Sequence, residues 1–62
     1  MKETQQPKGI YVCKFRGVGD DEYEHQPNDV WIRDDGFVRW IYSGMVFLVP
    51  KENIIFLSRK VE

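Results

Sequence analysis

The stretch that decides the fold is residues 30–49, VWIRDDGFVRWIYSGMVFLV. It contains three apolar segments, at residues 30–33, 37–42 and 45–49. All three are rich in the β-branched and aromatic residues that favour strands. Asp35-Gly36 and Ser43-Gly44 separate them, and both pairs are typical of two-residue hairpin turns, whose central residues need positive φ. This stretch therefore predicts a three-stranded antiparallel meander.

The residues on either side of this meander extend the β pattern. Residues 10–16 and 54–57 are β-branched and aromatic, and each predicts a further strand. Residues 17–29 are glycine-rich and then acidic, which indicates a long loop between the first two strands, functional or folded back as a hairpin. Pro50 ends the third strand of the meander, and residues 51–53 predict one turn of 3₁₀ helix. We therefore expect an all-β fold of about five strands.

Two-residue turns fix which side chains share a face of the meander. They place Trp31 opposite Trp40 and Trp40 opposite Phe47, and this aromatic row predicts the core. The other face then carries aliphatic side chains around Arg39, an apolar surface too large to stay wet. We expect the first and last strands to cover it by closing a barrel, or a second subunit to cover it in a homodimer. The interface residues would be Val30, Ile32, Ile41, Val46 and Leu48.

The chain has 62 residues, which predicts one small domain at residues 9–58 with a flexible tail at 1–8 and a polar tail at 59–62. Its only cysteine, Cys13, leaves no intramolecular disulfide, and this fits the cytoplasm. Nine aromatic residues argue against disorder, since disordered chains are poor in them. No apolar run is long enough to span a membrane, and residues 1–7 lack the apolar region of a signal peptide.

Charge is unevenly distributed along the chain. Residues 20–35 hold seven acidic residues and one arginine, a net charge of −6, whereas the rest carries +5. The total of −1 argues against a strongly basic nucleic-acid binder. The acidic segment either is simply solvated or steers a basic partner to the surface.

No combination of residues predicts catalysis. Cys13 alternates within a strand as a buried apolar residue does, and His25 is a lone base in the acidic segment. The spacing of the acidic residues fits no EF-hand loop, and residues 17–20 lack the Lys-Ser/Thr of a phosphate-binding loop. We therefore expect a protein that is not an enzyme and uses no metal and no cofactor.

The order of these features resembles a Src homology 3 type barrel over residues 10–57. Residues 49–54, VPKENI, are similar to the proline-containing segment that enters the family's last strand. Residues 34–37, DDGF, resemble its acidic-Gly-aromatic entry to the third strand, and the acidic loop resembles its long first loop. The family's aromatic-rich motif is missing from residues 10–15, and Phe37-Val38 stands where the family has tandem tryptophans.

This resemblance implies a partly open barrel. The family binds proline-rich peptides in an aromatic groove, and Tyr23, Phe37 and Pro50 would lie near such a groove. A fold alone does not supply a function, so the resemblance predicts the barrel and not its ligand.

Two functions fit these observations. The first is a small module that binds another protein and blocks its surface, as accessory and inhibitor proteins of phages and mobile elements do. The partner-binding residues would be Asp20, Asp21, Glu22, Tyr23, Glu24, Arg33 and Arg39, because aromatic and arginine side chains are frequent hot spots. The alternative is a small barrel that binds single-stranded nucleic acid through aromatic stacking and basic side chains, although the acidic segment and the net charge argue against it.

Overall fold

A computed structural model describes residues 2–60, which contain seven strands, two short 3₁₀ turns and no α-helix. The strands are β1 Glu3–Gln5, β2 Tyr11–Arg16, β3 Glu22–His25, β4 Val30–Arg33, β5 Phe37–Tyr42, β6 Met45–Pro50 and β7 Ile54–Arg59. The 3₁₀ turns are η1 Val18–Asp20 and η2 Lys51–Asn53. The all-β fold, the β4–β5–β6 meander and the 3₁₀ turn at 51–53 are confirmed.

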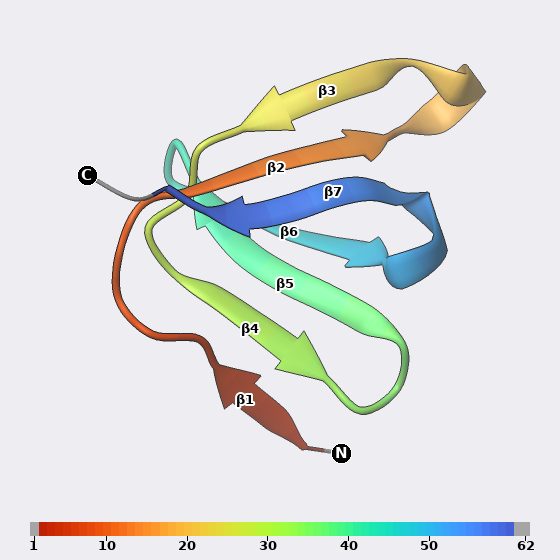
Figure 1. Cartoon of the computed structure of the whole chain (residues 1–62). Coiled ribbons are helices and arrows are strands. Elements are labelled where there is room, and N and C mark those ends of the chain that lie inside the picture. Colours follow the sequence, from red (N-terminus) through yellow and green to blue (C-terminus); the bar gives the residue numbers. More distant parts are fainter. Residues whose placement is uncertain (1, 61–62) are drawn as a thin grey trace.

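The strands form two antiparallel sheets (Figure 1). One has the order β1-β4-β5-β6, and the other has the order β3-β2-β7. Among residues 2–60 no strand ladder joins the two sheets, so the structure has two sheets rather than a closed barrel. The chain passes from one sheet to the other over residues 26–29, where buried Pro27 accepts a hydrogen bond from the Tyr11 backbone at 2.9 Å.

Two segments without predicted strands prove to be strands. Residues 3–5, expected in a flexible tail, pair with β4 and place Glu3 opposite Arg33. Residues 22–25, expected in a loop, pair with β2 and place His25 opposite Cys13. The last strand also continues to Arg59, one residue into the expected polar tail. Residue 1 and residues 61–62, assigned to the tails, lie outside the described residues.

The predicted register of β5 on β6 is confirmed, with Trp40 opposite Phe47 and Tyr42 opposite Met45. The turn between them has positive φ at Ser43 (54°) and Gly44 (75°), as a two-residue hairpin requires.

The predicted register of β4 on β5 is wrong by one residue. Trp40 lies opposite Val30, and Trp31 lies opposite Arg39. The connecting loop has three residues and ends in Gly36 at φ 89°, which only glycine adopts readily. Because side chains alternate, this shift exchanges the two faces of β4. It places Arg33 on the same face as Arg39, so that both arginines stay out of the core.

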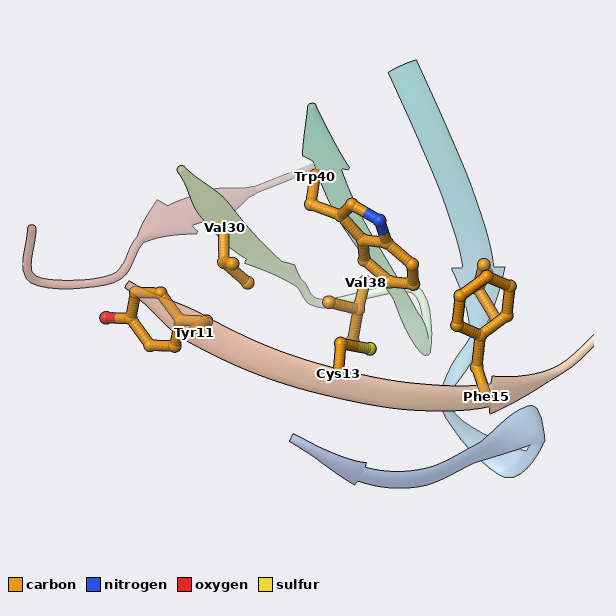
Figure 2. Close-up of a cluster of buried hydrophobic side chains, with 7 residues drawn as sticks. Tyr11, Cys13, Phe15, Val30, Val38 and Trp40 are labelled. Atoms are coloured by element: carbon orange, nitrogen blue, oxygen red, sulfur yellow. The ribbon is translucent and has the colours of Figure 1, made fainter. Parts of the chain in front are cut away.

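The core lies between the two sheets (Figure 2). Its buried members are Tyr11, Cys13, Phe15, Val30, Val38, Trp40 and Val49. Ile32, Phe47, Ile54 and Leu57 pack against it. Trp40 is the largest side chain that is fully buried. Its ring meets Phe15 of the opposite sheet edge-on, with 5.1 Å between ring centroids, and so joins the two layers.

Neighbouring residues of β4 give a direct test of the register. Val30→Asn puts an amide into the core, and we expect it to lower the free energy of unfolding by about 2–4 kcal/mol, from lost burial and an unsatisfied polar group. Trp31 lies on the outer face, so we expect Trp31→Asn to lower the free energy of unfolding by about 1 kcal/mol or less. Urea unfolding of the two variants measures the difference. A larger loss for Trp31→Asn would contradict the observed register.

Candidate functional site

The outer face of the four-stranded sheet carries the main candidate surface. One cross-strand row consists of Gln5, Trp31, Arg39 and Leu48, in that order across the four strands. The adjacent row contains the neighbours Ile41 and Val46, and Glu3 and Arg33 pair on the other side of the first row. This face therefore has a charged half, near β1 and β4, and an aliphatic half, on β5 and β6.

Glu3 organises the charged half. Its carboxylate accepts hydrogen bonds from Arg39 at 3.0 and 3.1 Å, and Arg33 Nη1 lies 3.5 Å away. The Arg39 guanidinium also lies over the Trp31 ring, 4.1 Å from its centroid, as in a cation–π contact. Arg39 is thus held from two sides by residues of β1 and β4.

Arg33 is tied down from the hairpin loop as well. Its Nε and Nη2 donate to the Asp35 carboxylate at 3.2 and 2.8 Å, and the Phe37 backbone N–H donates to the same group at 3.3 Å. The hydrogen bond from Arg33 lowers the pKa of the Asp35 carboxyl. These pairs are exposed, and pairs of this kind contribute about 0–1 kcal/mol each, so they orient side chains more than they stabilise the fold.

The aliphatic half is open to solvent. Ile41 is 40% exposed, Val46 is 61% exposed and Leu48 is 48% exposed, although all three are hydrophobic. Single exposed hydrophobic residues are ordinary, but three neighbours on two adjacent strands form a patch. A fixed arginine and a tryptophan at its border give the composition typical of a protein-binding surface.

Two of the five residues predicted for an oligomer interface are wrong. Val30 is fully buried, and Ile32 packs against the core. The cause is the one-residue shift of β4, which turns both side chains inward. Ile41, Val46 and Leu48 do lie on the outer face.

The seven predicted partner-binding residues do not form one surface. Arg33 and Arg39 lie on the four-stranded sheet, whereas Asp20, Asp21, Glu22, Tyr23 and Glu24 lie in η1, β3 and the residue between them. On β3 the acidic side chains lie opposite basic residues of β2, with Glu24 opposite Lys14 and Glu22 opposite Arg16. Lys14 Nζ also lies 3.3 Å from the Glu22 carboxylate. The acidic segment is therefore partly neutralised within its own sheet.

Tyr23 of β3 packs inward against its own hairpin. Its ring centroid lies 5.8 Å from that of Phe15, and the ring covers Gly17 so closely that a Cβ there would lie 2.6 Å from Tyr23 Cε2. Gly17 is thus a close-approach glycine. The other two residues that the family resemblance points to, Phe37 and Pro50, pair with each other across β5 and β6 in the other sheet.

His25 lies in an aromatic cluster, not in a solvated acidic loop. Its ring stacks on Tyr42 with 4.2 Å between centroids and meets Phe47 edge-on at 4.6 Å and Phe15 at 4.9 Å. The Trp40 indole Nε1–H donates to His25 Nδ1 at 3.1 Å. The sequence signal for this arrangement is the strict alternation of Glu22-Tyr23-Glu24-His25, which is typical of a strand with one face inward.

Burial and the tryptophan hydrogen bond act on His25 in the same direction. Desolvation lowers its pKa, because it disfavours the charged imidazolium. Protonation of Nδ1 would also set a second donor against the indole N–H. Both effects disfavour the protonated imidazolium of His25 in the folded protein.

Other chemistry finds little support in the part of the chain that the structure describes. Between residues 2 and 60 no three histidine, cysteine or acidic side chains gather as a metal site. No helix there is long and apolar enough to cross a membrane. A shallow depression of about 440 Å³ lies beside Lys8, Gly9, Ile10, Asn28 and Asp29.

The neutral His25 makes stability depend on pH. Folding lowers the pKa of His25. The contribution of this residue to the free energy of unfolding is therefore present above its unfolded-state pKa of about 6.5 and is lost as the pH falls below that value. We expect the free energy of unfolding to fall as the pH is lowered through about 6.5. His25→Gln keeps an acceptor for Trp40 without a titrating group and should show a flatter profile. Equal pH dependence in both proteins would contradict this role.

The thiol of Cys13 is fully buried, and desolvation raises its pKa to about 11. Since the thiolate is the reactive form, we expect the folded protein to resist a disulfide reagent at neutral pH. Reaction should follow unfolding and match that of a free thiol in urea. Rapid labelling of the folded protein would show that β2 is not covered as described.

The chain was compared with protein-family models, with curated proteins and with solved structures, and none of them matched it. Function is therefore argued from the geometry of the surfaces described above.

Proposed function

We propose that this protein is a small non-enzymatic module that binds another protein through the outer face of its four-stranded sheet. The observation that carries the proposal is the exposed aliphatic patch of Ile41, Val46 and Leu48 beside the fixed Trp31–Arg39 pair. Binding here blocks the partner's surface, which is the action expected of an accessory or inhibitor protein. The cytoplasm, where a lone thiol stays reduced, is the proposed site of action.

Preorganisation of Arg39 supports this surface. Immobilising a long side chain on binding costs about 0.5–1.5 kcal/mol of free energy. Glu3 and Trp31 already hold Arg39 in place before a partner binds, so Arg39 loses little further freedom on binding. Glu3 also balances its charge, so the partner need not supply a carboxylate. The partner chemistry that fits is an apolar surface with a few hydrogen-bond acceptors at its rim.

The acidic segment has a secondary role in this proposal. Asp20 and Asp21 lie outside the β2–β3 ladder, where their charges face solvent. Charges at this position accelerate encounter with a basic partner without forming the contact itself. A charge reversal at these two residues should therefore slow association and leave dissociation nearly unchanged.

Binding of single-stranded nucleic acid has less support. Three of the cations that could follow a phosphate backbone, Lys14, Arg33 and Arg39, each lie within 3.5 Å of a carboxylate. The rings of Phe15, Phe47 and Trp40 pack in or against the core, so they are not free to stack on bases.

Ile41→Glu tests the proposed face. This residue is exposed on β5, so the fold should tolerate the change, while a charge enters the middle of the patch. Proteins captured from the native host by the immobilised wild type should be lost with this variant. For a captured partner we expect the Kd to rise at least about tenfold.

The matched control is Ile55→Glu, because Ile55 is an equally hydrophobic residue of β7 that is 44% exposed in the other sheet. It should retain every partner that the wild type captures. Capture that survives Ile41→Glu, or is lost equally with both variants, would overturn the proposed face.

A further inference from the structure

The edge of β6 differs from the other sheet edges of residues 2–60. These edges are formed by β1, β6, β3 and β7. β1 carries Glu3, β3 carries Glu22 and Glu24, and β7 carries Arg59 and pairs with β2 through an irregular register. Charges and bulges of this kind protect an edge against pairing with another chain. The β6 residues at 45–49, MVFLV, carry no charge.

The hydrogen-bond pattern shows which backbone groups this edge presents. In a two-residue hairpin the residues flanking the turn, Tyr42 and Met45, form a hydrogen-bonded pair, and such pairs then recur at every second residue. The Lys51 N–H, which donates to Gly36 O at 2.8 Å, continues the same series. The N–H and C=O groups of Val46 and Leu48 therefore point away from β5.

Within the described residues no strand pairs with β6 on that side. The side chains of Val46 and Leu48 are largely exposed, as shown above. An uncharged apolar strand of six residues with an open edge is a template for a further strand.

We propose that the occupant of this edge is the β6 strand of a second copy, which pairs antiparallel about a two-fold axis with Phe47 opposite its own copy. In this register Val46 of each copy faces Leu48 of the other as a hydrogen-bonded pair, and four backbone hydrogen bonds form across the axis. Phe47 lies opposite its own copy at the closer, non-hydrogen-bonded pair, and its half-buried ring stays on the core side against Trp40 and His25.

Pro50 favours this register over a slipped one. A shift by two residues would place Val46 opposite Pro50, which has no N–H to donate. A shift by two residues in the opposite direction would place Leu48 opposite Gly44, which lies in the turn and not in the strand. Val46 and Leu48 therefore use every edge N–H and C=O group that they present only when the two-fold axis passes through Phe47.

The absence of charge on β6 allows it to pair with a second copy of itself, and the small buried area sets the strength of the contact. Self-pairing of β3 would bring its glutamates close to their copies, whereas self-pairing of β6 brings only apolar side chains together. A contact of five residues per strand buries less than the roughly 1,200 Å² of a stable interface. The dimer is therefore weak and depends on concentration. It joins two outer faces into one continuous sheet surface.

This inference does not rest on the proposed function. Ile41 lies on β5, away from the pairing edge, so its charged variants disturb the outer face and spare the β6 contact. Loss of partner binding with Ile41→Glu while the protein still dimerises therefore separates the two proposals.

Sedimentation velocity from about 1 μM to about 1 mM, combined with amide exchange followed by NMR, tests the pairing. We expect the sedimentation coefficient to rise with concentration toward that of a dimer. The amide protons of Val46 and Leu48 should exchange rapidly in dilute protein and become protected in concentrated protein. A monomer at all concentrations, or a dimer in which these two amides stay unprotected, would overturn the proposal.

The double substitution Val46→Lys with Leu48→Lys opposes like charges across the axis on side chains that are exposed, so the fold should persist. We expect the dimer Kd to rise at least about tenfold. Ile41→Lys is the matched control on the same face and should dimerise as the wild type does. Dimerisation lost with Ile41→Lys but retained with the double variant would show packing of faces instead of edges and would overturn the proposal.

Discussion

The structure depends on burying the Trp40 indole without leaving its N–H unsatisfied. A buried donor with no acceptor costs about 1–3 kcal/mol, a large share of the stability of a 62-residue chain. His25 Nδ1 supplies the acceptor, and the acceptor must come from the other sheet because Trp40 points between the layers. This requirement explains why residues 22–25 form an ordered strand despite their charge: β3 carries His25 to the indole.

The side chains of β3 alternate between an aromatic and a charged environment. Its residue His25 enters the aromatic cluster and its residue Tyr23, which is 46% exposed, lies over Phe15, while Glu22 and Glu24 face the basic side chains of β2. The charge of the acidic segment therefore protects an edge and pairs with β2, and little of it is left as an isolated patch. On the other sheet, Glu3 orders the side chains of Arg39 and Arg33 on the outer face. Both arginines lie there because the apolar core cannot bury their charge.

Prediction succeeded where a short-range rule decides the outcome and failed where distant segments compete. Ser43-Gly44 fixed the β5–β6 register because a two-residue turn with positive φ leaves one choice. Asp35-Gly36 led to the wrong β4–β5 register, because aspartate before glycine suits both a two-residue turn and the three-residue loop that the structure contains. The choice between them depends on which register keeps Arg33 outside the core and brings Val30 to Trp40. The observed register turns Val30 and Ile32 inward, so these two residues cannot belong to the predicted interface. Ile41, Val46 and Leu48 lie on the outer face.

The sequence by itself determined the all-β class, the meander of residues 30–50, the 3₁₀ turn and the buried character of Cys13, because turn chemistry and residue propensity act over a few neighbours. The tertiary structure alone decided that residues 3–5 and 22–25 are strands, which face of β4 is buried, and that His25 accepts from Trp40. Each of these depends on a partner far along the chain: Glu3 is 36 residues from Arg39, and His25 is 15 from Trp40. A polar strand has no strong local preference, so its conformation is set by the partner that satisfies its backbone and side chains.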